Sequence, residues 1–145
     1  MLKSVQMKNI LGLIFILLFI QLVQTKAQNE EKLIYKQRRE ILLNQMDGGI
    51  AIFKGAKSVN RNGDVEYPFR QNSDVYYLTG FNEPASAFLV IPGEKKKFVM
   101  FVRQRNLMME IWMGKRAGIE GAMQEFGADT AFGIGLFNFT WSKLR

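Results

Sequence analysis

The stretch Asp64–Pro84, DVEYPFRQNSDVYYLTGFNEP, indicates what kind of domain this chain forms. It combines two prolines and a glycine with aromatic side chains that stand next to charged ones. This is too polar and too aromatic at once for an ordinary core strand. Aromatic residues beside charges are typical of a hydrated interface or of the wall of a ligand site. The stretch therefore points to a functional surface.

Two motifs carry a resemblance to a known family. Tyr67–Pro84 reads YPFRQNSDVYYLTGFNEP, and Glu110–Gly118 reads EIWMGKRAG. Together, in this order and at this distance, they resemble the N-terminal domain of Xaa-Pro aminopeptidase (aminopeptidase P), of the creatinase/prolidase group. The resemblance runs from about Lys36 to about Phe132. It implies an α/β fold of three layers, in which a mixed β-sheet is flanked by helices.

Composition excludes several kinds of site. The chain has 145 residues, of which 48% are hydrophobic, and this is enough for one domain. It has no Cys and no His, so disulfides, thiolate metal sites and imidazole chemistry are excluded. The formal net charge is +7, yet the only basic run is Lys95–Lys97, which fits a solvated turn. We therefore expect no nucleic-acid partner.

The N-terminal residues have the pattern of an export signal. Lys3 and Lys8 precede the apolar run Ile10–Val23, and small residues follow at Thr25 and Ala27. A membrane span needs roughly 20 apolar residues, and this run is shorter. We expect residues 1–27 to be a signal peptide, residues 28–145 to form the domain, and the protein to be periplasmic or secreted. An uncleaved membrane anchor is the alternative.

The apolar pattern predicts the secondary structure. Residues Asn29–Met46 have helical spacing, and glycines follow that end a helix. Further along, short apolar runs predict strands, two of them joined as an antiparallel hairpin. The predicted strands are Gly49–Phe53, Val75–Leu78, Ser86–Ile91 and Phe98–Val102, with a turn at Asn62-Gly63 and a second helix at Ile119–Phe126. This order also indicates a mixed α/β sheet. Similarity fades after about Phe132, so we expect a C-terminally truncated domain.

The resemblance implies no catalytic residue on this chain. In the family, activity resides in a C-terminal domain in which Asp, Glu and His side chains bind two divalent metals, usually manganese. A two-metal site needs several converging carboxylates and usually imidazole, and the acids here follow no ligand pattern. We therefore expect no metal and no cofactor on this chain.

The resemblance also implies a supporting role for two residues. In the family's oligomers, the Trp of the second motif, here Trp112, helps to wall the substrate pocket of a neighbouring subunit, and Asp64 matches an Asp near that pocket. The alternatives are that Trp112 is ordinary core or interface packing and that Asp64 caps a turn.

Other matched residues have predicted structural or interface roles. Arg70 and Asp74 are expected to form an arginine–carboxylate pair, and polar side chains between them to bond the backbone of a long loop. Tyr67 is expected to pack against a partner domain or in the core. Arg116 is expected to form an interface salt bridge, or to contribute nothing measurable.

These observations favour one function over two alternatives. The first hypothesis is the non-catalytic N-terminal domain of an exported Xaa-Pro aminopeptidase, which contributes to oligomerisation and to a neighbour's substrate pocket. Its partners would be a second copy or a catalytic domain, with proline-containing peptides reaching it only in the full-length enzyme. The alternatives are a stand-alone peptide- or protein-binding module and a membrane-tethered structural protein.

Overall fold

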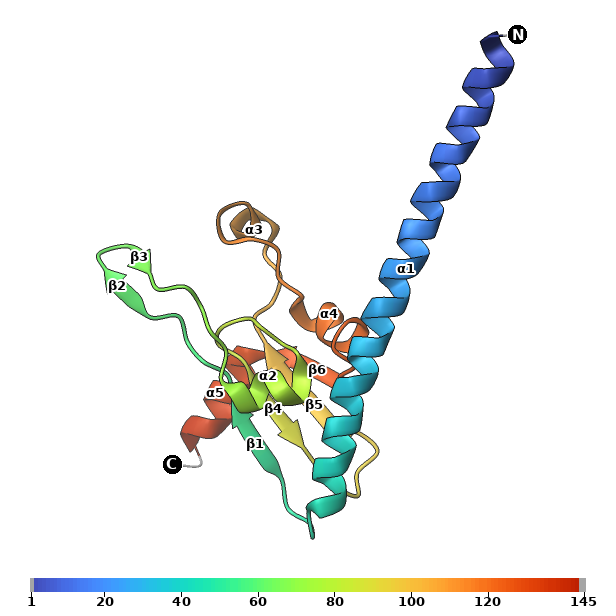
Figure 1. Ribbon diagram of the computed structural model, residues 1–145. Coiled ribbons are helices and arrows are strands. Elements are labelled where there is room, and N and C mark those ends of the chain that lie inside the picture. Colours follow the sequence, from blue (N-terminus) through green and yellow to red (C-terminus); the bar gives the residue numbers. More distant parts are fainter. Residues whose placement is uncertain (1, 144–145) are drawn as a thin grey trace. The chain divides into compact units, whose positions relative to one another are not determined.

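The computed structural model describes the backbone of residues 2–143 and the side chains of residues 12–26 and 29–139. Two compact units are present, Met1–Ile34 and Tyr35–Arg145. The elements, in chain order and as labelled in Figure 1, are α1 (Leu2–Gln45), β1 (Ala51–Lys54), β2 (Asn60–Asn62), β3 (Val65–Glu66), α2 (Ser73–Thr79), β4 (Ala87–Val90), β5 (Phe98–Val102), α3 (Leu107–Met113), α4 (Gly118–Gln124), β6 (Thr130–Gly133) and α5 (Ile134–Lys143).

The first unit is the N-terminal part of α1. Its large apolar side chains from Leu13 to Val23 are between 46% and 72% exposed. Within the described residues, no helix combines the length and the hydropathy that a membrane span requires. The side chains of Lys3, Lys8 and Ala27, on which the signal-peptide prediction rests, lie outside the described residues.

The predicted helix Asn29–Met46 is the C-terminal part of α1. Its expected start at Asn29 is wrong, because the helix is already continuous from Leu2. Its end is confirmed, since α1 stops at Gln45 and two glycines follow with positive φ, 125° at Gly48 and 77° at Gly49. Glycine reaches such angles without the Cβ clash that other residues meet.

The second unit is built on a four-stranded mixed sheet with the order β1-β4-β5-β6. Strands β1 and β4 pair antiparallel, as do β4 and β5, with Val90 opposite Phe98. Strands β5 and β6 pair parallel, and α3 and α4 lie between them in the chain. The predicted hairpin and the predicted mixed sheet are confirmed, and the strand predicted at Gly49–Phe53 is the edge strand β1.

Alternation along the central strands gives the sheet two apolar faces. Phe88 and Met100 lie on the face that packs with Leu43 of α1, Val75 of α2 and Ala122 of α4. On the other face Ala87, Val99 and Phe101 pack against Phe137 of α5. In Figure 1, α2 lies in front of the sheet and α5 behind it. The three-layer arrangement of helices around a mixed sheet is confirmed.

The strand predicted at Val75–Leu78 is wrong, because these residues form the helix α2. Tyr and Val suit a strand, but Val75, Leu78 and Thr79 are the buried residues, which is helical spacing. The side chains of Arg38 and Arg39 donate hydrogen bonds to the carbonyls of Tyr77 and Leu78, each at 2.9 Å. Cations from α1 thus satisfy the end of this short helix.

Five elements were not predicted from the sequence, namely the strands β2, β3 and β6 and the helices α3 and α5. The polar segment between β1 and α2 also holds an exposed two-stranded hairpin of β2 and β3. Its turn lies at Gly63-Asp64, where the φ of Gly63 is 53°, so the turn predicted at Asn62-Gly63 is confirmed to within one residue.

Candidate functional site

Gln71 holds together the loops on either side of α2. It is 5% exposed. Its Oε1 accepts hydrogen bonds from the backbone N–H of Ala56 (2.7 Å) and Asn72 (3.1 Å). Its Nε2 donates to the carbonyls of Phe81 (3.3 Å) and Glu83 (3.0 Å). One side-chain amide therefore fixes the segment after β1 relative to the segment after α2.

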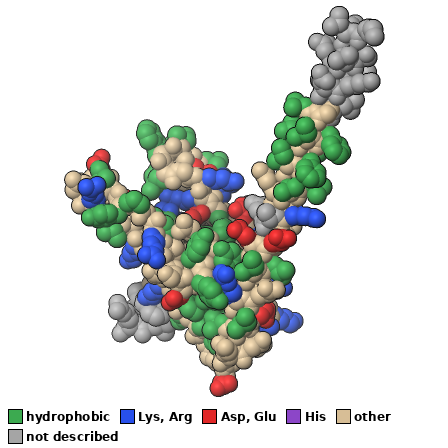
Figure 2. Space-filling view, viewed as in Figure 1, with side chains coloured by type: hydrophobic (Ala, Val, Ile, Leu, Met, Phe, Trp, Pro, Cys, Tyr) green, Lys and Arg blue, Asp and Glu red, His purple; other side chains and the backbone are tan. Residues whose placement is uncertain are grey.

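Helix α3 exposes apolar side chains to solvent. None of its residues is buried, and Trp112 and Ile111 are 85% and 82% exposed. Figure 2 shows hydrophobic side chains gathered on this part of the surface. Contiguous apolar surface of this kind marks an interaction site in soluble proteins. Trp112 is therefore not core packing in the described part of the chain.

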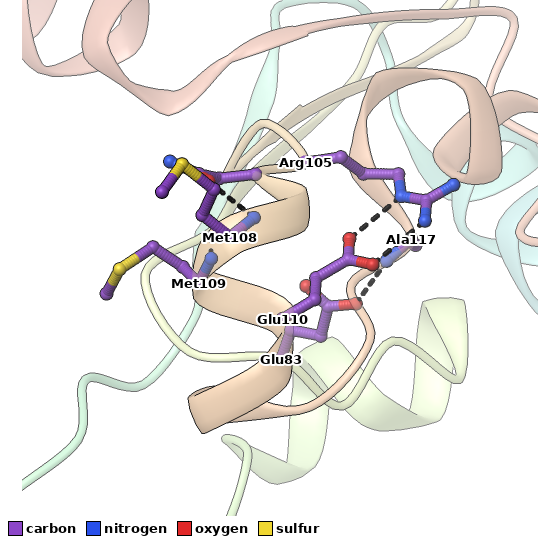
Figure 3. A network of polar contacts seen from close by, with 7 residues as sticks. Glu83, Arg105, Met108, Met109, Glu110 and Ala117 are labelled. Atoms are coloured by element: carbon purple, nitrogen blue, oxygen red, sulfur yellow. Dashed lines mark hydrogen bonds and ion pairs between the residues drawn. The ribbon is translucent and has the colours of Figure 1, made fainter.

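Polar contacts hold α3 in place (Figure 3). The side chain of Asn106 caps its start by accepting hydrogen bonds from the N–H groups of Met108 and Met109, at 3.1 and 3.2 Å. Arg105 forms a bidentate ion pair with Glu110, with both N–O distances 2.8 Å. This hydrogen bond lowers the pKa of the Glu110 carboxyl. These contacts, all within residues 105–110, stabilise the helical conformation of α3.

A second contact ties the chain after α3 to the loop after α2. Glu83 Oε1 accepts a hydrogen bond from the backbone N–H of Ala117 at 2.7 Å, as Figure 3 shows. Because Gln71 bonds the carbonyl of the same Glu83, the loop that it organises is connected to α3. The position of Trp112 therefore depends on residues from three separate segments.

An open cleft of about 750 Å³ lies between these segments and the hairpin of β2 and β3. We call it the Trp112 cleft. Figure 1 shows the hairpin and α3 projecting on the same side of the sheet. The lining residues are Ser58, Asn60, Asp64, Glu66, Phe69, Asn82, Glu83, Pro84, Arg103, Trp112, Met113, Lys115 and Arg116. Its volume lies in the range of ligand-binding sites.

The Trp112 cleft contains charged groups of both signs. Burial, and after it the nearby Arg116 cation, lower the pKa of Arg103, while Glu83 and Glu66 act in the opposite direction. Within the described residues, Arg103 Nε and Glu83 Oε2 are buried without a hydrogen-bond partner. Buried polar atoms are normally paired, so these two atoms are exceptions next to the Trp112 cleft.

The structure brings together three of the residues predicted from the sequence. Trp112, Asp64 and Arg116 all line the Trp112 cleft. Asp64 lies in the turn of the hairpin and is exposed. The proximity of Trp112 and Asp64, which are far apart in the sequence, is what a shared pocket role requires. Their predicted role in a neighbour's pocket stays a prediction.

The other predicted residues lie elsewhere. Arg70 and Asp74 are exposed at the start of α2, and neither takes part in an ion pair among the described residues. The side-chain to backbone bonds expected nearby come from Gln71 and from Asn72, whose Nδ2 donates to the carbonyl of Lys54 at 2.8 Å. Tyr67 is 54% exposed, so it is not a core residue of the described chain.

Sequence reasoning missed Glu83 and Arg103. Glu83 precedes a proline at the end of the first motif, and Arg103 directly follows the buried strand Phe98–Val102. A charged residue at the end of a buried strand is a usable signal for a site. No group of three or more His, Cys, Asp or Glu side chains that could hold a metal occurs among the residues that the structure describes.

Comparisons with known sequences give the relatives of this chain. Residues 35–144 match the family model described as "Aminopeptidase P, N-terminal domain". The chain is 40% identical over 107 residues to "Xaa-Pro aminopeptidase" of Escherichia coli (strain K12), covering 72% of this chain and 24% of that protein. With the Haemophilus influenzae protein of the same name it is 38% identical over 112 residues, covering 76% and 26%. The chain thus spans about a quarter of these relatives' length.

Solved structures agree with the sequence comparisons. Aminopeptidase PepP of Pseudomonas aeruginosa superposes with a TM-score of 0.72 at 43% identity, covering 78% of this chain and 26% of that one. A low-pH form of E. coli aminopeptidase P gives 0.70 at 38% identity, with the same coverage. The resemblance carried by the two motifs is confirmed, and the chain belongs to the aminopeptidase P N-terminal domain family.

Proposed function

We propose that this chain is the non-catalytic N-terminal domain of an exported Xaa-Pro aminopeptidase, a metallopeptidase that acts on peptides with an N-terminal Xaa-Pro sequence. In this proposal its surface contributes to oligomerisation and to the wall of a neighbouring subunit's substrate pocket. Membership of the family supports the proposal. So do the relatives named Xaa-Pro aminopeptidase, of which the chain covers about a quarter.

One observation carries the pocket role. Helix α3 exposes apolar side chains and has no buried residue, and the Asn106 cap and the Arg105–Glu110 pair stabilise its helical conformation. An exposed apolar segment that is already helical needs less ordering of its own backbone when it binds a partner surface, which lowers the entropic cost of association. A docked subunit would bury Trp112, and large aromatic residues of this kind dominate binding energy at interfaces.

The chemistry of the Trp112 cleft fits a supporting role. The indole of Trp112 offers a flat apolar wall, and Asp64 at the rim offers a carboxylate that attracts a positively charged peptide amino terminus. In this proposal both catalysis and the two divalent metals, usually manganese, belong to the catalytic domain of the full-length enzyme. Residues of this chain then shape and limit what enters the pocket.

Complementation tests the proposal. The full chain would be mixed with the separately produced catalytic domain of E. coli Xaa-Pro aminopeptidase, and release of the first residue from an Xaa-Pro peptide would be followed with manganese present. We expect no release by the chain alone, and a higher kcat/KM when the two are combined. In the chain variant Trp112→Ala, this increase in kcat/KM should be lost or reduced. The matched control is Leu136→Ala, which truncates an apolar side chain of α5 that is 51% exposed and should leave the increase unchanged. Chelator-sensitive turnover by the chain alone would overturn the proposal.

Export is tested separately. Residues 1–27 would be removed during translocation, so the intact mass of protein recovered from outside the cytoplasm should correspond to a start after Ala27. A mass that retains these residues in the membrane fraction would favour the anchored alternative instead. This result is independent of the pocket role.

A further inference from the structure

A second cleft lies beside α2, apart from Trp112. It has a volume of about 520 Å³, and we call it the α2 cleft. Its lining residues are Arg38, Phe69, Arg70, Gln71, Ser73, Tyr76, Tyr77 and Asn82. This is a combination of arginine, aromatic rings and small polar groups, at a volume that suits a bound ligand.

The charge of the α2 cleft is one-sided. Two of its lining side chains are guanidinium groups, those of Arg38 and Arg70, and none of the described residues that line it carries a carboxylate. Asp74 lies on the same helix, but it lines a neighbouring cleft. Guanidinium groups pair with carboxylates through two parallel hydrogen bonds. The cleft is therefore complementary to a carboxylate.

Arg38 is held in place. Its Nη1 donates to the carbonyl of Tyr77 at 2.9 Å, and its guanidinium carbon lies 4.2 Å from the centre of the Tyr77 ring and 5.3 Å from that of Tyr35. A guanidinium stacked in this way retains further N–H donors for a ligand. Arg70, by contrast, is exposed and forms no ion pair among the described residues.

Aromatic surface on the same helix is open to solvent. Tyr76 and Tyr77 are 48% and 55% exposed. The Tyr76 ring is fixed edge-on to Tyr35, with centroids 6.4 Å apart. Rigid tyrosines provide contact area at little entropic cost, so this surface can pack the apolar side chains of a ligand.

The two clefts adjoin each other. Phe69 and Asn82 line both the α2 cleft and the Trp112 cleft. Arginine and tyrosine side chains line the α2 cleft together, and an extended chain can present acidic side chains to the first and apolar side chains to the second. The lining of the α2 cleft thus combines guanidinium groups that can pair with carboxylates and aromatic contact area.

From these contacts we propose that the α2 cleft binds an extended acidic peptide segment. Its carboxylates pair with Arg70 and Arg38, and its apolar side chains pack on Tyr76 and Tyr77. This inference goes beyond the pocket role of Trp112 and does not depend on it. The segment can belong to any peptide that presents alternating acidic and apolar residues.

Two capped tetrapeptides test the inference, Ac-EFEF-NH2 and its uncharged counterpart Ac-QFQF-NH2. Each would be titrated into the isotopically labelled full chain in a non-ionic detergent at low salt, and backbone amide shifts would be followed by NMR. We expect Ac-EFEF-NH2 to shift the amides of Ser73 to Tyr77. We expect Ac-QFQF-NH2 to bind at least about tenfold more weakly, since it forms no charge-assisted bonds.

Variants separate the outcomes. Arg70→Glu should weaken Ac-EFEF-NH2 at least about tenfold, and Arg70→Gln should weaken it less. Arg61→Glu, the same charge change on the exposed strand β2, should leave it unchanged. Trp112→Ala should also leave it unchanged, even if it abolishes the proposed pocket role. Equal affinity for both peptides, no effect of Arg70→Glu, or shifts that respond only to Trp112→Ala would overturn the inference.

Discussion

Replacing Gln71 by alanine should destabilise the domain and loosen the Trp112 cleft. The side-chain amide is 5% exposed and makes four hydrogen bonds to backbone groups. These bonds bring together segments that flank α2, including the loop that carries Glu83. The local sequence alone does not indicate that this neutral side-chain amide joins these segments.

The size of the effect follows from which bonds are buried. The bond to the carbonyl of Phe81 is buried, whereas those involving Ala56, Asn72 and Glu83 are partly buried. A buried group left without a partner costs about 1–3 kcal/mol, and a bond that water can replace costs less, about 0.5–1.5 kcal/mol. We expect Gln71→Ala to lower the free energy of unfolding by about 3 kcal/mol or more in total.

Urea denaturation followed by circular dichroism measures this change. The matched control is Asn72→Ala, which removes one exposed side-chain bond to Lys54 and should cost about 1 kcal/mol or less. A second readout is amide hydrogen exchange at Ala117, which Glu83 holds, and which should become faster in Gln71→Ala. If the free energy of unfolding of Gln71→Ala lies within about 0.5 kcal/mol of that of the unchanged chain, the role assigned to this amide is refuted.

Two further predictions concern the scaffold and pH. Gly80 has φ 67° and an added Cβ would meet the ring of Tyr35, so Gly80→Ala should lower the urea midpoint by an amount that corresponds to about 1–3 kcal/mol. Because the pKa of Glu110 is lowered by Arg105, their pair contributes stability above the ordinary glutamate pKa and loses it as pH falls through the lowered value. Amide exchange in α3 should therefore accelerate in acid, and Glu110→Gln should remove this dependence.

The parts of the fold that could be predicted are those in which local pattern and tertiary environment agree. The hairpin of β4 and β5 has apolar runs on both sides of a Pro-Gly turn, and every residue of β5 is buried. The end of α1 has two glycines with positive φ. In both cases proline or glycine restricts or permits a particular backbone conformation at the turn, and the buried apolar residues agree with it.

The parts that could not be predicted depend on long-range contacts. Val-Tyr-Tyr-Leu suits a strand locally, but arginines from α1 satisfy the last carbonyls of α2 and make the short helix favourable. Strand β6 is only four residues long and is defined by its parallel pairing with β5 across α3 and α4. Neither contact is visible in the local sequence.

The same distinction holds for the site. Trp112 and Asp64 were expected together because of the resemblance, and both line one cleft. Glu83 and Arg103 were missed because their significance lies in buried atoms without partners, Oε2 and Nε, which only the packing reveals among the described residues. The pairing expected for Arg70 and Asp74 does not occur among the described residues, where both side chains are exposed.

The affinity of the full chain for a separately produced aminopeptidase P catalytic domain tests the central claim most directly. Trp112 is 85% exposed, so Trp112→Ala should leave the free energy of unfolding within about 0.5 kcal/mol. If this residue is an interface anchor, the same change should weaken binding by about 2 kcal/mol or more, roughly thirtyfold. Equal affinities for the unchanged chain and Trp112→Ala, with Leu136→Ala as the control, would contradict the account.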